Sequence, residues 1–100
     1  MTPSNRAARL TAAAERGYAD AQCTLGALYC NGGADVELGA EWFKRASDQG
    51  HADAEFVMGC LYRAGLGVPR NVGAAKIMLH RAASKGHADA LAELSSVKFE

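Results

Sequence analysis

The five residues Gly17-Tyr18-Ala19-Asp20-Ala21 return as Gly50-His51-Ala52-Asp53-Ala54 and again as Gly86-His87-Ala88-Asp89-Ala90. The copies start 33 and 36 residues apart, a spacing typical of helical repeats. Behind the first two copies lies a second match in register, Leu25-Gly26-Ala27-Leu28-Tyr29 against Met58-Gly59-Cys60-Leu61-Tyr62. This internal repeat decides the fold.

Each repeat contains two segments in which apolar residues recur at the spacing of one helix face. The first segments carry the stripes Ala21, Leu25 and Leu28, then Ala54, Met58 and Leu61. The second segments carry Val36, Gly39, Phe43 and Ala46, then Val72, Ala75, Leu79 and Ala82. No stretch alternates with period two over the length of a strand, so the chain is predicted to be all-α.

Short polar residues and glycines predict where these helices begin and end. Asp35 and Asn71 are expected N-caps of the second helices, because their side chains can accept from free N–H groups of the first turn. A left-handed glycine is expected after each helix end, at Gly17, Gly50 and Gly86. Gly26 and Gly59 lie within helices at a cost of about 1 kcal/mol against Ala. We therefore expect a neighbouring helix to approach closely at both.

These residues resemble the SEL-one-like repeat, an alpha-solenoid repeat related to the tetratricopeptide repeat. The resemblance rests on the Leu-Gly-x-Leu-Tyr helix, on the loop from Gly65 to Val68, and on the closing Ala82-Ala83-x-x-Gly86. It covers residues 17 to 96. The repeat predicts a right-handed alpha-alpha superhelix, a short solenoid of about six helices.

The chain is expected to be a single solenoid domain, residues 1–100. It divides into an N-terminal half repeat (4–16), repeat one (17–49), repeat two (50–85) and a C-terminal half repeat or cap (86–100). The loop between the helices of repeat one is three residues shorter than in repeat two, and Gly39 stands where the family normally has Ala, so this helix pair is expected to be less regular. Ser95 and Lys98 break the pattern of the last copy. They indicate either a polar cap or the remains of a longer array.

Composition excludes several function classes. The 100 residues are 49% hydrophobic and carry no net charge, so a non-specific electrostatic grip on nucleic acid or membrane is not expected. Charge is uneven along the chain, with seven acids and two bases in residues 20 to 60 but five bases and no acid in residues 61 to 88. No apolar run approaches the roughly 20 residues of a membrane span. Neither nucleic acid nor a membrane is therefore an expected partner. The repeat architecture, with its extended surface, indicates a protein or peptide partner instead.

The cysteines indicate the compartment. They are odd in number, and Cys23 and Cys30 lie seven residues apart on one predicted helix, about 10 Å along its axis, which is too far for a disulfide. Free thiols favour the cytoplasm. A periplasmic or secreted location stays open if a signal peptide has been removed.

Neither catalysis nor metal binding is predicted. His51 and His87 take the repeat position of Tyr18, so the repeat explains them. The cysteines form no Cys-x-x-Cys pair and have no histidine at zinc-finger spacing, so no metal is expected. The sequence Gly65-Leu66-Gly67 resembles a dinucleotide loop but has Arg70 in place of the third glycine, and no cofactor is predicted.

The candidate site is the row of first-helix residues that points away from the predicted core. In tetratricopeptide-like arrays such a row lines a concave groove. By the repeat alignment it contains Asp20, Cys23, Ala27, Cys30, Asp53, Phe56, Cys60, Arg63, Ala92 and Ser96. The predicted partner-binding residues are Cys23, Cys30, Asp53, Phe56, Cys60 and Arg63. Phe56 is either an aromatic anchor for a partner or a packing residue against the neighbouring first helix.

The function predicted from this row is that of a non-enzymatic protein–protein interaction module, an adaptor or scaffold that presents a concave groove to a peptide or protein. The resemblance agrees, since such repeats commonly act as adaptors and some bacterial members act in host interaction. One alternative is a fragment or cap of a larger repeat scaffold. Another is a beta-lactam-binding or beta-lactam-hydrolysing enzyme, as suggested for cysteine-rich bacterial relatives. Those relatives pair cysteines between the two helices of a repeat, and the second helices here carry none.

Overall fold

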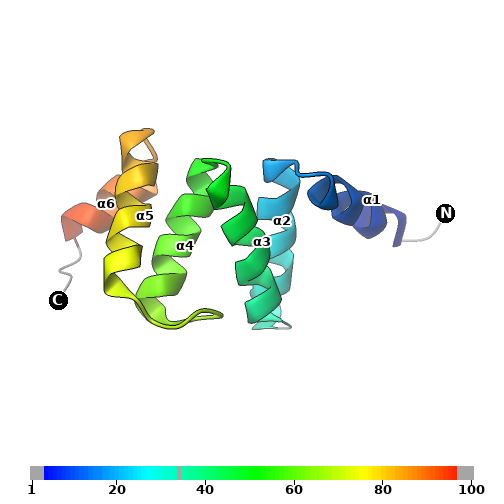
Figure 1. Ribbon diagram of the computed structural model, residues 1–100, viewed down its shortest axis with the longest axis horizontal. Coiled ribbons are helices and arrows are strands. Elements are labelled where there is room, and N and C mark those ends of the chain that lie inside the picture. The colour runs from blue at the N-terminus through cyan, green and yellow to red at the C-terminus, as the bar shows by residue number, and fades with distance from the viewer. Residues whose placement is uncertain (1–3, 34, 97–100) are drawn as a thin grey trace.

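The computed structural model describes residues 4–33 and 35–96, and Lys98 lies outside these ranges. This part of the chain forms six α-helices and a single 3-10 turn, without any strand: α1 (Ser4–Glu15), α2 (Ala19–Cys30), η1 (Asn31–Gly33), α3 (Val36–Asp48), α4 (Ala52–Ala64), α5 (Val72–Ser84) and α6 (Ala88–Ser96). The most extensive contacts join helices that are consecutive in the chain. The molecule is elongated, 49 × 25 × 18 Å, with α1 and α6 at opposite ends (Figure 1). The prediction of an all-α solenoid is confirmed.

The same turn closes three helices. After α3, Gly50 has a φ of +83°, and the N–H of His51 donates to the carbonyl of Ala46 over 3.2 Å. The turns at Gly17 and Gly86 repeat this geometry. Because this turn ends the second helix of a repeat, α1, α3 and α5 are second helices, and α2, α4 and α6 are first helices.

Both predicted N-caps are confirmed. Asp35 Oδ1 accepts from the N–H of Leu38 at 3.0 Å, and Asn71 Oδ1 accepts from the N–H of Ala74 at 3.0 Å. An oxygen in this position satisfies one of the free donors of the first helical turn. The second helices of both repeats therefore begin where the sequence predicts.

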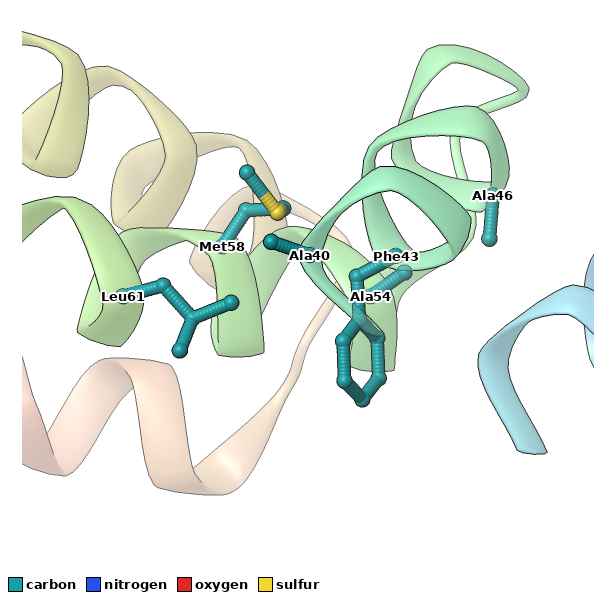
Figure 2. Close-up of a cluster of buried hydrophobic side chains, with 6 residues drawn as sticks. All are labelled: Ala40, Phe43, Ala46, Ala54, Met58 and Leu61. Carbon is teal, nitrogen blue, oxygen red and sulfur yellow. The ribbon is translucent and has the colours of Figure 1, made fainter. Parts of the chain in front are cut away.

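The core is a series of small clusters at the junctions between helices. The largest cluster joins α3 to α4 and consists of Ala40, Phe43, Ala46, Ala54, Met58 and Leu61 (Figure 2). A second joins α1, α2 and α3 through Ala14, Leu25 and Trp42, and a third joins α5 to α6 through Leu79, Ala82 and Ala90. Each helix pair is thus stabilised chiefly by its neighbours, as in other solenoids.

The two glycines within the first helices lie at close helix crossings. A Cβ atom at Gly59 would lie 2.8 Å from Leu79 Cγ, and one at Gly26 would lie 2.9 Å from the carbonyl oxygen of Gly39. Gly39 in turn faces Gly26, since its own Cβ would lie 2.8 Å from the Gly26 carbonyl oxygen. The predicted close approach is confirmed at both positions.

One predicted core residue is exposed to solvent. Leu28 is 56% exposed, whereas Leu61, at the same position in repeat two, is 8% exposed. In repeat two the loop after α4 reaches back to α3, and its Val68 packs against the cluster that contains Leu61. The shorter loop of repeat one lacks this element, and α1 diverges from α2 towards the N-terminal end of the molecule (Figure 1). The prediction that Leu28 belongs to the core was wrong for this reason.

Candidate functional site

The predicted row of residues runs along the three first helices, which are tied to one another by polar contacts. His51 Nε2, at the start of α4, lies 2.8 Å from Asp20 Oδ1 of α2. At the next junction, His87 Nε2 lies 2.7 Å from Asp53 Oδ1, and Arg63 donates to Glu93 Oε2 of α6 at 2.7 Å. We call this row, as defined above, the first-helix face.

The two histidines have a structural role in the repeat. Nδ1 of His51 accepts the backbone N–H of Ala54 at 3.2 Å, so its Nε2 carries the proton and donates to the Asp20 carboxylate. His87 does the same with Ala90 and Asp53. Each imidazole therefore caps one first helix and links it to the preceding one, which confirms the prediction that the repeat explains both residues.

Phe56 and Arg63 both have partners within the chain. The ring of Phe56 stacks on that of His87, with centroids 4.8 Å apart and planes 20° from parallel, and it packs against the cluster of Leu79, Ala82 and Ala90. Phe56 remains half-buried, and the Arg63 side chain is 33% exposed although it is paired with Glu93. Of the two interpretations of Phe56, the structure shows the packing contact, made here against the start of α6.

The three thiols are free and are held in the protonated form. Burial, with the nearby carboxylates of Asp53 and Asp20, raises the pKa of Cys23 to about 11. Burial also raises the pKa of Cys30. The pKa of Cys60 is raised by burial and by the Glu93 carboxylate, whereas the Arg63 guanidinium lowers it. A thiol in this state is a weak nucleophile and a weak metal ligand. No group of three metal-ligating side chains lies close together in residues 4–33 and 35–96.

Sequence reasoning missed a polar pair in each repeat that joins one buried side chain to a more exposed one. Glu55 of α4 is 2% exposed, and both its carboxylate oxygens accept from Lys85 Nζ, at 2.6 and 2.7 Å. In repeat one the aligned residues are Gln22 and Gln49, which are joined by an amide hydrogen bond of 3.0 Å. The sequence signal was available, because the two aligned positions change together from Gln and Gln to Glu and Lys.

Sequence reasoning also missed a groove on the surface. Between α1 and α2 lies an open groove of about 480 Å³, lined by Arg6, Ala7, Leu10, Thr24 and Leu28. Its floor is apolar, and none of these residues belongs to the first-helix face. The signal for it was the loop of repeat one, three residues too short to reach this position.

Stacked helix pairs with recurrent caps, close glycine crossings and a continuous row of first helices define an α-solenoid repeat protein. The sequence profile of the Sel1 repeat matches residues 19–51 and 52–87, and the chain belongs to the Sel1 repeat family. Sel1 repeats generally serve as protein–protein interaction modules. No curated protein matches the chain significantly.

Two solved structures are similar to this chain. A Sel1 repeat protein from Oxalobacter formigenes is 36% identical over 89% of the chain, with a TM-score of 0.84. The protein c5321, a protective antigen present in uropathogenic Escherichia coli strains and displaying an SLR fold, is 40% identical over 82% of the chain, with a TM-score of 0.77. The chain spans 27% and 18% of the length of these two proteins. None of the helices described here is long and apolar enough to cross a membrane.

Proposed function

We propose that this chain is a non-enzymatic adaptor that holds a peptide or protein segment on its first-helix face. The observation that carries the proposal is that hydrogen bonds of His51, His87 and Arg63 join α2, α4 and α6. These contacts fix the side chains of the face before a partner binds. A surface that is already ordered loses less conformational entropy on binding.

The distribution of charge on the face supports an elongated partner. Asp20 and Asp53 lie in the first turns of α2 and α4, with side chains 97% and 71% exposed. Arg63 lies at the other end of α4, and the half-buried Phe56 and Cys60 lie between. The charge of Arg63 is compensated by Glu93, so the order that matches is a segment with a basic residue near the acids and an apolar residue over Phe56.

The chemistry of the site favours binding over catalysis. A catalytic thiol needs a lowered pKa, and all three thiols have a raised one. His51 and His87 each use one ring nitrogen to cap a helix and the other to contact a carboxylate. Neither imidazole is available as a general base without loss of a structural contact. A reducing cytoplasm is the compartment that suits the free thiols.

The test compares two arginine variants of the protein as bait in native lysate. Ala92→Arg places a bulky cation in the exposed row position of α6, whereas Ala12→Arg places the same side chain on an exposed position of the second helix α1. Proteins captured by the parent are quantified by mass spectrometry. We expect at least one partner that is retained by Ala12→Arg and lost by Ala92→Arg, with both variants folded by circular dichroism. Partners lost equally from both variants, or from neither, would contradict the proposal.

A further inference from the structure

The groove between α1 and α2 is a copy of a site that is filled in repeat two. The repeat alignment places its residues Ala7, Leu10 and Leu28 at the positions of Ala40, Phe43 and Leu61. Those three residues are buried, at 1%, 3% and 8% exposure, whereas Leu28 is 56% exposed. Among the residues that the structure describes, the same apolar surface is therefore covered at one junction and open at the other.

The occupant in repeat two is the loop that follows α4. Its Gly67 has a φ of +72° and lies directly against α3, since a Cβ there would be 3.1 Å from Ala40 Cβ and 2.6 Å from the carbonyl oxygen of Val36. The next residue, Val68, packs against the cluster that includes Ala40, Phe43 and Leu61 along with Ala46, Ala54 and Met58. A glycine in close contact with the helix and a valine on the cluster are thus the features that fill this kind of site.

Repeat one lacks the segment that fills this site in repeat two. The linker between α2 and α3 runs from residue 31 to residue 35 and lacks the three residues that carry the Gly-Val element in repeat two. It leaves a groove of about 480 Å³ with an apolar floor, and Arg6 at the rim is exposed. The groove is large enough for several side chains of a peptide.

We propose that the groove between α1 and α2 binds an extended segment of a partner protein that carries glycine followed by valine, in the place that Gly67 and Val68 take in repeat two. The glycine lies against Ala7, and the valine packs between Leu10 and Leu28. Arg6 at the rim favours an acidic residue beside the Gly-Val pair. This site goes beyond the proposed function, because it shares no residue with the first-helix face.

The first arm of the test supplies the missing segment covalently. Residues 31–34 are replaced by residues 64–70 of the same chain, and the methyl groups of Leu28 are followed by NMR in the presence of a soluble paramagnetic agent. In the parent protein we expect Leu28 to be broadened far more than Leu61, and in the grafted protein the two should be broadened equally. The matched control carries Val68→Asp within the grafted loop and should leave Leu28 accessible.

The second arm supplies the segment in trans, with a synthetic peptide of residues 64–71 as the probe. We expect the methyl signals of Leu10 and Leu28 to shift in the parent protein and not in the grafted protein, whose groove is filled. A peptide with Val68→Asp should shift neither signal.

Three results would overturn the proposal. In the first, Leu28 is already protected from the paramagnetic agent in the free protein. Residues near the N-terminus would then cover the groove, or a second copy of the chain would if the protection rises with protein concentration. In the second, the grafted loop leaves Leu28 as accessible as in the parent. In the third, the peptide moves neither methyl signal or moves them equally in the grafted protein. The first-helix face is unaffected by each of these outcomes.

Discussion

The buried carboxylate of Glu55 allows a sharp test of how the repeat is stabilised. Glu55 is 2% exposed and receives both its short hydrogen bonds from Lys85 Nζ. Removing one partner of a fully buried ion pair costs about 3–5 kcal/mol, because the other charge is left unpaired. The Lys85 side chain is 42% exposed, so water can reach the vacated position. We therefore expect Lys85→Met to lower the free energy of unfolding by about 2–3 kcal/mol.

Repeat one shows how the loss can be repaired. Gln22 and Gln49 take the same two positions there, and Gln49 Nε2 also donates to the carbonyl of Gly17 at 2.8 Å. The double variant Glu55→Gln with Lys85→Gln should reproduce this uncharged pair. Because both amides then have hydrogen-bond partners, its stability should lie within about 1 kcal/mol of the parent.

Thermal and urea unfolding followed by circular dichroism measures both changes. For a domain of this size 1 kcal/mol corresponds to about 4–8 °C, so Lys85→Met should lower Tm by roughly 8–24 °C. The control Lys44→Met breaks an exposed ion pair with Asp48 and should cost less than about 1 kcal/mol. A Lys85→Met variant as stable as the parent would refute the reasoning, as would a double glutamine variant no more stable than Lys85→Met.

Three further predictions follow from the contacts described. Gly59→Ala should destabilise the protein by about 1–2 kcal/mol in thermal melts, because overpacking outweighs the gain in helix propensity. The control Gly73→Ala should be neutral or stabilising, because a Cβ at this position would meet only Asn71 Oδ1, at 3.5 Å. His87→Ala removes a helix cap and a ring contact and should lower the free energy of unfolding by about 1–2 kcal/mol. The control His80→Ala, at an exposed position, should change it by less than about 0.5 kcal/mol. Equal losses of stability in the two variants would contradict the structural role of His87. Burial and the carboxylates of Asp53 and Asp20 raise the pKa of Cys23 to about 11. Its alkylation by iodoacetamide, followed by peptide mass spectrometry, should therefore rise about tenfold per pH unit up to about pH 10, whereas the rate for a free cysteine with a pKa of about 8.5 levels off above about pH 9.5. A rate for Cys23 that levels off at about pH 9.5 would show that the thiol is not shielded.

The architecture could be predicted from the sequence because the same capping residues and mid-helix glycines recur in both repeats. Asp35 and Asn71 cap their helices, and Gly26 and Gly59 lie at helix crossings, as their positions in the pattern predict. Each of these features depends on residues close in sequence or on the contact between consecutive helices. Such features are the ones that periodicity and capping describe well.

The exposure of Leu28 could not be predicted from its helix alone. Its periodicity is that of a buried residue, but its burial depends on a loop that is present only in repeat two and on the course of α1. The packing of Phe56 was one of two interpretations that the sequence left open. The ion pair of Arg63 was beyond sequence reasoning, because its partner Glu93 lies about 30 residues away, in α6. Contacts between repeats thus decide how much of the candidate site is open to a partner.

The most direct test of the account is to map where a captured partner binds. The amide signals of the labelled protein are recorded by NMR while the partner is added. We expect the largest shifts to fall on the first-helix face, at Asp53, Phe56, Cys60 and Arg63. Shifts confined to the outer surfaces of α3 and α5, around Arg45 and Arg81, would show that the opposite side of the solenoid is the binding surface and would contradict the central claim.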